Sequence, residues 1–177
     1  MRDILISIIR HGQTDCNLRG VLQGQMETSL NSTGRDEAEK LGARLQNESY
    51  THVNSSNMER AEETARIVLR NNGVVTQKVK DEIRFDARLR ERSFGVFEGK
   101  PKEEFADFND KASRKKDYPG RKHFTPPNGE SISTVYARAR ECLIEILWNV
   151  VVKSMFRRTV LRNNCAYRIF ILSIINV

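Results

Sequence analysis

A six-residue run of uncharged and mostly β-branched residues near the start of the chain ends abruptly in polar residues. It covers Ile4 to Ile9, and Arg10-His11-Gly12 follows directly. A run of this kind is typical of a parallel strand that is buried on both faces. We therefore expect Ile4–Ile9 to form a central parallel strand, with Arg10-His11-Gly12 in the loop at its carboxyl end.

Strand-like and helix-like patterns alternate along the rest of the chain. Further strands are expected at 50–53 and 74–79, and helices at about 34–46, from Met58 through Val68, at 105–116 and at 131–148. Such alternation favours an α/β fold, a three-layer sandwich with a mostly parallel central sheet and right-handed crossovers. Active sites in these sheets gather at the carboxyl ends of the strands.

The net charge of +7 is unevenly distributed along the 177 residues. Residues 149–177 hold five of the thirty Lys and Arg residues and none of the twenty-three Asp and Glu residues. Residues 1–148 therefore carry 25 basic and 23 acidic residues, a nearly balanced charge. This distribution argues against a nucleic-acid partner and predicts a domain at 1–148 followed by a basic, divergent tail at 149–177.

The cysteines and the apolar stretches limit the class of protein further. Cys16, Cys142 and Cys165 are odd in number and lack metal-ligand spacing, so we expect no disulfide framework, no metal site and a cytoplasmic location. The longest strongly apolar stretch, 169–175, is too short to span a bilayer, and no signal peptide is legible. We expect no membrane partner.

Residues suited to phosphoryl transfer follow two of the expected strands. A neutral imidazole at His11 can attack phosphorus, and the neighbouring guanidinium of Arg10 can bind phosphoryl oxygens. Arg60 follows the second strand, and Glu91 can protonate a leaving oxygen. Each also has an ordinary structural interpretation: His11 as a hydrogen-bonded loop residue, Arg60 as a solvated helix cation and Glu91 as part of a surface ion-pair network.

The same residues lie inside five segments that occur in the order typical of one family. These segments are Ile8-Ile9-Arg10-His11-Gly12-Gln13-Thr14-Asp15-Cys16-Asn17, Leu22-Gln23-Gly24-Gln25, Leu30-Asn31-Ser32-Thr33-Gly34, Ser55-Ser56-Asn57-Met58-Glu59-Arg60-Ala61 and Glu91-Arg92-Ser93-Phe94-Gly95-Val96-Phe97-Glu98-Gly99. Together they resemble the histidine phosphatase superfamily, the phosphoglycerate mutase-like clan. Within it, Phe124-Thr125-Pro126-Pro127-Asn128-Gly129-Glu130-Ser131 is most similar to TIGAR-type fructose-2,6-bisphosphatases.

The resemblance implies a role for each matching residue. It implies that His11 is the nucleophile that becomes phosphohistidine and that Arg10 and Arg60 are the arginines of the phosphate pocket. It implies that Asn17 is a polar contact of the phosphate and that Glu91 donates a proton to the leaving oxygen. Gln23 and Gly24 are implied to lie in a loop against the substrate. It also implies that neither a metal nor an organic cofactor is needed and that the ligand is a small phosphorylated metabolite. It does not indicate any protein partner.

One family feature is missing from the sequence. The family places a second histidine after a late strand, whereas His52 and His123 lie elsewhere and are expected to be structural and solvent-exposed, respectively. Arg168-Ile169-Phe170-Ile171-Leu172-Ser173 resembles that late strand, at about 168–175, and would put Ile174 in the histidine's place. The alternative is that the sequence after Trp148 is unrelated. In either case we expect the fold to be incomplete at its C-terminus.

Three functions remain open at this point. The first is a phosphatase that hydrolyses a phosphomonoester of a sugar bisphosphate such as fructose 2,6-bisphosphate through a phosphohistidine, with activity impaired by the missing histidine. The second is a phosphoglycerate mutase or a broad phosphomonoesterase, because the phosphate pocket alone does not select the substrate. The third is an inactive regulatory protein that binds a phosphorylated ligand.

The alignment of Ile174 with the missing histidine can be tested directly. Losing one donor to the transferring phosphoryl group commonly costs about 2.7 to 4 kcal/mol of transition-state stabilisation. We expect Ile174→His to raise phosphatase activity, measured as phosphate release by the purified protein. An unchanged rate in a folded variant would contradict this alignment.

Overall fold

Four parallel strands form a single sheet in the computed structural model, which describes residues 4–156 and 167–172. Their order across the sheet is β1-β4-β2-β3. The bounds are Ile4–Ile9 for β1, His52–Ser55 for β2, Arg84–Phe85 for β3 and Tyr167–Leu172 for β4. The late strand expected at 168–175 is therefore present at Tyr167–Leu172 and pairs with both β1 and β2.

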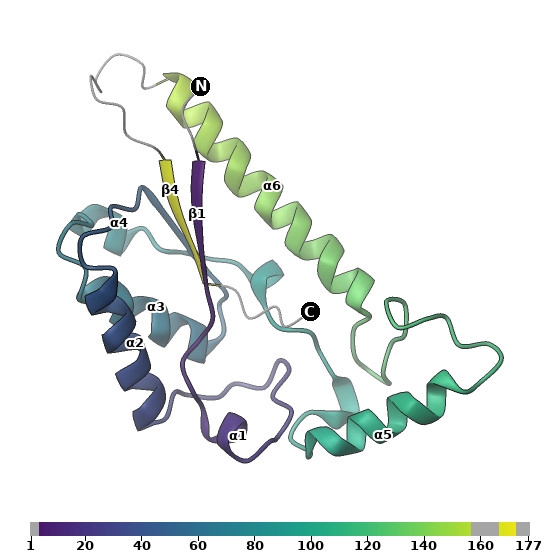
Figure 1. Ribbon diagram of the computed structural model, residues 1–177. Helices are drawn as coiled ribbons and strands as arrows, with labels where there is room; N and C mark the ends of the chain where they lie inside the picture. Colours follow the sequence, from purple (N-terminus) through teal and green to yellow (C-terminus); the bar gives the residue numbers. More distant parts are fainter. Residues whose placement is uncertain (1–3, 157–166, 173–177) are drawn as a thin grey trace.

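Helices cover both faces of this sheet, as Figure 1 shows. The face opposite α6 carries α2 (Ser32–Arg44), α3 (Glu59–Arg70) and the short α4 (Gln77–Asp81), and the other carries the long α6 (Ile132–Phe156). The remaining helical segments are α1 (Asp15–Leu18), the 3-10 turns Ala87–Leu89 and Gly95–Phe97, and α5 (Lys102–Ser113). The three-layer α/β sandwich with a parallel sheet is confirmed.

Two hydrophobic clusters hold the layers together. One joins α2 and α3 to the sheet through buried residues that include Ile9, Val53 and Val68. The other packs α6 against β4, where Ile169 and Ile171 point toward the helix from alternate positions of the strand. The two clusters lie on opposite faces of the sheet because successive side chains of a strand point to opposite sides.

The predicted central position of Ile4–Ile9 is wrong within the described sheet. The strand is parallel, as expected, but β4 lies between it and β2, so β1 is at the edge. Ile8 is 74% exposed because α6 packs over β4 and not over this end of β1. A run of apolar residues indicates a strand, but its neighbours are set by the remainder of the chain.

The strand predicted at 74–79 is also wrong. The side chain of Asn72 accepts hydrogen bonds from the backbone N–H groups of Val74 and Val75, which turns the chain into the first turn of α4. The apolar side chain of Val79 then packs against the α2–α3 cluster from a helix. A short apolar run fits a helix as well as a strand, and here the strand follows later, at Arg84–Phe85.

The other predicted elements are present with shifted ends. The helix expected at 105–116 is α5 (Lys102–Ser113), and the helix expected at 131–148 is α6, which continues to Phe156. This continuous helix crosses the boundary that composition placed at residue 148, so the division into two parts stays a prediction. None of the helices in the described ranges is both long and apolar enough to cross a membrane.

A buried asparagine closes the α2–α3 layer. Asn72 is 1% exposed, and its amide nitrogen donates to the carbonyl oxygens of Leu45 and Glu48 at 2.6 and 2.9 Å. Its amide oxygen accepts from Val74 N at 3.0 Å and Val75 N at 2.8 Å. Because both halves of the amide are used, the side chain fixes the end of α2, the end of α3 and the start of α4 at once.

We expect Asn72→Asp to lower the free energy of unfolding by about 3 kcal/mol, because a buried carboxylate oxygen would then face two carbonyl oxygens without a proton to share. The measurement is urea denaturation followed by circular dichroism. Asn47→Asp, at an exposed position in the same connection, is the matched control. Equal stability losses in the two variants would contradict the assignment.

Candidate functional site

The predicted nucleophile is buried at the carboxyl end of β1. His11 is 6% exposed, and its Nδ1 lies 2.6 Å from the carbonyl oxygen of Gly12. A carbonyl oxygen only accepts hydrogen bonds, so Nδ1 carries the proton and Nε2 holds the lone pair of the neutral ring. Burial, with the nearby charges of Arg60 and Arg10, lowers the pKa of His11 to about 4 against the opposing effect of the Gly12 carbonyl. The ring is therefore neutral at physiological pH.

Close backbone packing fixes the loop that carries His11. A Cβ atom on Gly12 would lie 2.3 Å from the carbonyl oxygen of Gly34, and one on Gly34 would lie 2.1 Å from that of Gln13. The N–H of Gly12 donates to the hydroxyl of Thr64 at 3.1 Å, and that hydroxyl donates to the Arg60 carbonyl at 2.7 Å. The start of α2 and the first turns of α3 thus hold the histidine loop.

Arg60 lies at the centre of the site and has no exposed surface. Its Nη2 donates to Glu91 Oε2 at 3.1 Å and to the Gly24 carbonyl at 2.8 Å. Its Nη1 donates to the Met26 carbonyl at 3.0 Å and to the Thr28 hydroxyl at 3.3 Å. Burial lowers the pKa of Arg60 despite the carboxylate of Glu91 beside it. The interpretation of Arg60 as a solvated helix cation is therefore wrong.

Glu91 reaches the same place from the loop after the Ala87–Leu89 turn. The residue is 8% exposed, and its carboxyl group forms a buried ion pair with Arg60 inside the site. It does not lie in a surface ion-pair network. The predicted residues His11, Arg60 and Glu91 are thus brought together, and Arg10 acts on the pKa of His11 from an exposed position next to it.

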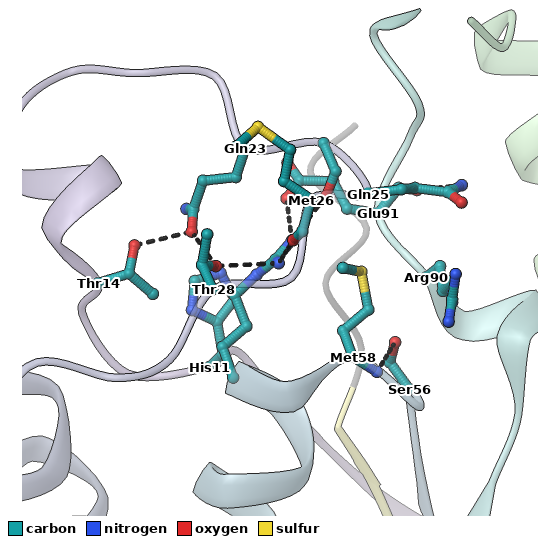
Figure 2. A network of polar contacts seen from close by, with 12 residues as sticks. His11, Thr14, Gln23, Gln25, Met26, Thr28, Ser56, Met58, Arg90 and Glu91 are labelled. Carbon is teal, nitrogen blue, oxygen red and sulfur yellow. Dashed lines mark hydrogen bonds and ion pairs between the residues drawn. The ribbon is translucent and has the colours of Figure 1, made fainter. Parts of the chain in front are cut away.

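A chain of polar side chains connects Arg60 to the loop after β1, and Figure 2 shows three of its members, Thr28, Gln23 and Thr14. Thr28 accepts from Arg60 and donates to Gln23 Oε1 at 2.7 Å, and Thr14 donates to the same oxygen at 2.7 Å. Two hydroxyl donors thereby fix the orientation of the buried Gln23 amide. Asn17 forms a reciprocal capping box with Thr14 at the start of α1, which fixes its position at the edge of this chain of contacts.

Neither of the other histidines supplies a second imidazole here. His52 starts β2, at the opposite end of the sheet from the loop after β1, and its Nδ1 lies 3.0 Å from the Thr51 hydroxyl. His123 is exposed, as expected, and contacts Ser133. Ile174 lies outside the described residues. In the part of the chain that the structure describes, no three His, Cys, Asp or Glu side chains are grouped to hold a metal ion.

Several residues of the site have no clear signal in the sequence. Thr28 and Thr64 contribute single hydroxyl groups from positions that no motif marks. Arg138 lies on α6, in a stretch that predicts only a helix, yet it contacts the carbonyl of Glu91. Glu130 and Gln25 belong to segments that resemble the family, but the sequence predicts no role for either side chain.

Comparisons with known proteins show the family to which the chain belongs. The sequence model of the histidine phosphatase superfamily (branch 1) matches residues 6–150. Fructose-2,6-bisphosphatase TIGAR B of Danio rerio is 36% identical over 160 residues, which cover 89% of this chain and 55% of that protein. The chain spans about half the length of the curated relatives it matches.

Two solved structures extend the comparison to the fold. Phosphoglycerate mutase of Bacillus anthracis superposes with a TM-score of 0.77 at 21% identity, covering 97% of this chain and 75% of that chain. A mycobacterial glucosyl-3-phosphoglycerate phosphatase in complex with VO3 gives a TM-score of 0.68 at 25% identity, covering 94% and 73%. The fold is therefore phosphoglycerate mutase-like, and the chain belongs to branch 1 of the histidine phosphatase superfamily.

Proposed function

We propose that this chain hydrolyses a phosphomonoester of a small phosphorylated sugar, of the fructose 2,6-bisphosphate type, through a phosphohistidine at His11. One observation carries the proposal. In the described ranges, the buried side-chain nitrogen and oxygen atoms without a hydrogen-bond partner are His11 Nε2 and Arg60 Nε. One is a lone pair and the other an N–H donor, and buried polar groups are ordinarily paired. A phosphoryl group would satisfy both, with its phosphorus facing the lone pair and an oxygen facing the donor.

The residues suit the two chemical steps of hydrolysis. In the first step, His11 Nε2 forms the bond to phosphorus while the bond to the ester oxygen breaks, and Glu91 gives its proton to that oxygen. In the second, water attacks the phosphohistidine, Glu91 takes up a proton from the water, and His11 Nε2 leaves with its lone pair. Arg60 and Arg10 offset the negative charge on the phosphoryl oxygens in both steps.

The ion pair between Arg60 and Glu91 fits the acid role of the carboxyl group. A phosphate that binds Arg60 competes with Glu91 for the same positive charge and adds negative charge beside it. Both effects favour the protonated carboxylic acid. Substrate binding thereby prepares the proton donor at the point where it is needed.

The substrate class and the location belong to the same proposal. The fructose 2,6-bisphosphate type is supported by the names of the relatives, at 36% and 37% identity for the first two. A cytoplasmic location is supported by the free thiols of Cys16 and Cys142. The rate is expected to be low, because the sequence offers no second histidine at the pocket and one lost donor commonly costs about 100- to 1,000-fold.

We expect radiolabelled fructose 2,6-bisphosphate to label the wild-type chain covalently on histidine, in a bond that is labile in acid and stable in base. His11→Ala should take up no label, because the attacking nitrogen is absent. Glu91→Gln should take up label about 100-fold or more slowly, the usual contribution of a general acid. The measurement is rapid-quench gel analysis, with Arg114→Met, directly after α5, as an exposed control.

Three outcomes separate the alternatives. Label that passes to water supports the phosphatase, and label that passes to a hydroxyl of a phosphoglycerate supports a mutase. Substrate binding without any label on His11 would contradict the proposal and support a regulatory protein that binds a phosphorylated ligand.

The pKa of His11 also predicts a pH dependence of stability. Because the pKa falls from 6.5 in the unfolded chain to about 4 in the fold, only the unfolded chain binds this proton in the range between them. Stability should therefore decrease as the pH falls from about 6.5 to about 4, by about 3 kcal/mol in total from this group. Urea denaturation at a series of pH values measures the slope. His11→Gln should flatten it, and an unaltered slope in that variant would contradict the assignment.

A further inference from the structure

Arg138, on α6, uses every donor of its guanidinium group on the loop that carries Glu91 and on one acidic side chain. Its Nη1 donates to the carbonyl oxygens of Arg88 and Arg90 at 2.8 and 2.7 Å. Its Nη2 donates to the Glu91 carbonyl and to Glu130 Oε2, each at 2.9 Å, and its Nε donates to Glu130 Oε1 at 2.9 Å. A guanidinium group has five N–H donors, so none is left over.

Glu130 provides the matching negative charge and extends the contact to the loop after Gln23. Its Oε2 also accepts from the Ser93 backbone N–H at 2.9 Å and from Gln25 Nε2 at 3.2 Å. Burial opposes ionisation of this carboxyl group, but the hydrogen bonds from Arg138, Ser93 and Gln25 outweigh it and lower its pKa. The pair is only partly accessible, with side-chain exposures of 16% and 21% for Arg138 and Glu130.

The backbone of Glu91 is therefore held by contacts that are separate from those of its carboxyl group. Its carbonyl oxygen accepts from Arg138 Nη2 at 2.9 Å and from Gln25 Nε2 at 3.1 Å. The carboxyl group itself meets Arg60 Nη2 at 3.1 Å. Two of the carbonyls bound by Arg138 belong to consecutive residues, Arg90 and Glu91, which restricts rotation of the peptide unit between them. The direction in which the Glu91 side chain leaves the backbone is thereby set.

We propose that Arg138, held by Glu130, is the positioning residue for the proton donor Glu91. The proposal deepens and rests on the proposed phosphatase function. Arg138 does not touch the reacting atoms, and it acts by holding the Glu91 carboxyl group at the distance from the leaving oxygen that proton transfer requires. General acid catalysis depends steeply on such geometry.

Leaving-group dependence distinguishes positioning from a merely structural role. An alkyl phosphate releases a strongly basic alkoxide that needs the proton from Glu91, whereas p-nitrophenyl phosphate releases a stable phenolate that does not. A variant that misplaces Glu91 should lose kcat/KM on the alkyl ester and keep it on the aryl ester, because kcat/KM reports the steps up to the phosphohistidine and leaves out the later hydrolysis, in which Glu91 acts as a base for both esters. A variant that is only less stable loses both rates by the same factor, because fewer molecules are folded.

The experiment compares kcat/KM on fructose 2,6-bisphosphate and on p-nitrophenyl phosphate for wild type, Glu91→Gln, Arg138→Met and Arg138→Lys. We expect Glu91→Gln to lose about 100-fold more on the sugar phosphate than on the aryl ester, in line with the usual contribution of a general acid. Arg138→Met should show the same selectivity at about 10-fold. Arg138→Lys should lie between Arg138→Met and wild type, because lysine keeps the charge but cannot reach three carbonyls together.

Arg88→Met is the matched control. Arg88 lies in the same loop and joins it to the same helix through Glu145 at 2.8 Å, but its side chain bonds Asp86 and not the backbone of Glu91. Its ratio of the two rates should equal that of wild type. Circular dichroism establishes that each variant is folded. If Arg138→Met does not fold, Arg138→Lys alone tests the role of Arg138.

Each outcome has one meaning. A rate ratio in the Arg138 variants that equals wild type, while Glu91→Gln shows the selective loss, would overturn the positioning role and leave the phosphatase in place. A wild-type chain that hydrolyses neither ester would overturn the phosphatase and this role with it. Selective loss in both the Glu91 and the Arg138 variants supports both.

Discussion

A guanidinium group without exposed surface organises the functional site. Removing the charge of Arg60 from water is costly, and the fold offsets the cost with one carboxylate and three oxygen acceptors from two separate loops. The 24–28 loop and the 88–91 loop therefore converge on α3. Burial is the main cause that lowers the pKa of the neighbouring His11, and the positive charge of Arg60 acts in the same direction. The proposed nucleophile His11, the proposed phosphate ligand Arg60 and the proposed proton donor Glu91 are thus arranged around one buried ion pair.

The loops around that ion pair are fixed from outside as well as from inside. Thr64 holds the loop of His11 from α3, and Arg138 holds the loop of Glu91 from α6. The two helices lie on opposite faces of the sheet (Figure 1). The geometry of the site therefore depends on the packing of all three layers, through contacts in which a side chain of one layer binds the backbone of a loop.

The late strand β4 joins β1 to β2 in one sheet, although the sequence lacks the second histidine that the family resemblance predicts. β4 pairs with β1 over six residue pairs and with β2 over four. Without it, the carboxyl ends of β1 and β2 would not be held side by side, and the residues after them would not meet. The strand is thus needed to bring the residues of the site together.

The sequence alone determined the fold class, the order of most elements and the positions of His11, Arg60 and Glu91, because local apolar periodicity and short motifs carry that information. It did not determine that β1 lies at an edge, that 77–81 is a helix, or that Arg138 binds the backbone of Glu91. The strand neighbours of β1 come from residues about 160 positions away, and the 74–79 run is too short for its periodicity to distinguish strand from helix. Arg138 meets Glu91 across 47 positions, through backbone carbonyls that have no signature in any sequence. Contacts of that range exist only once the layers have packed.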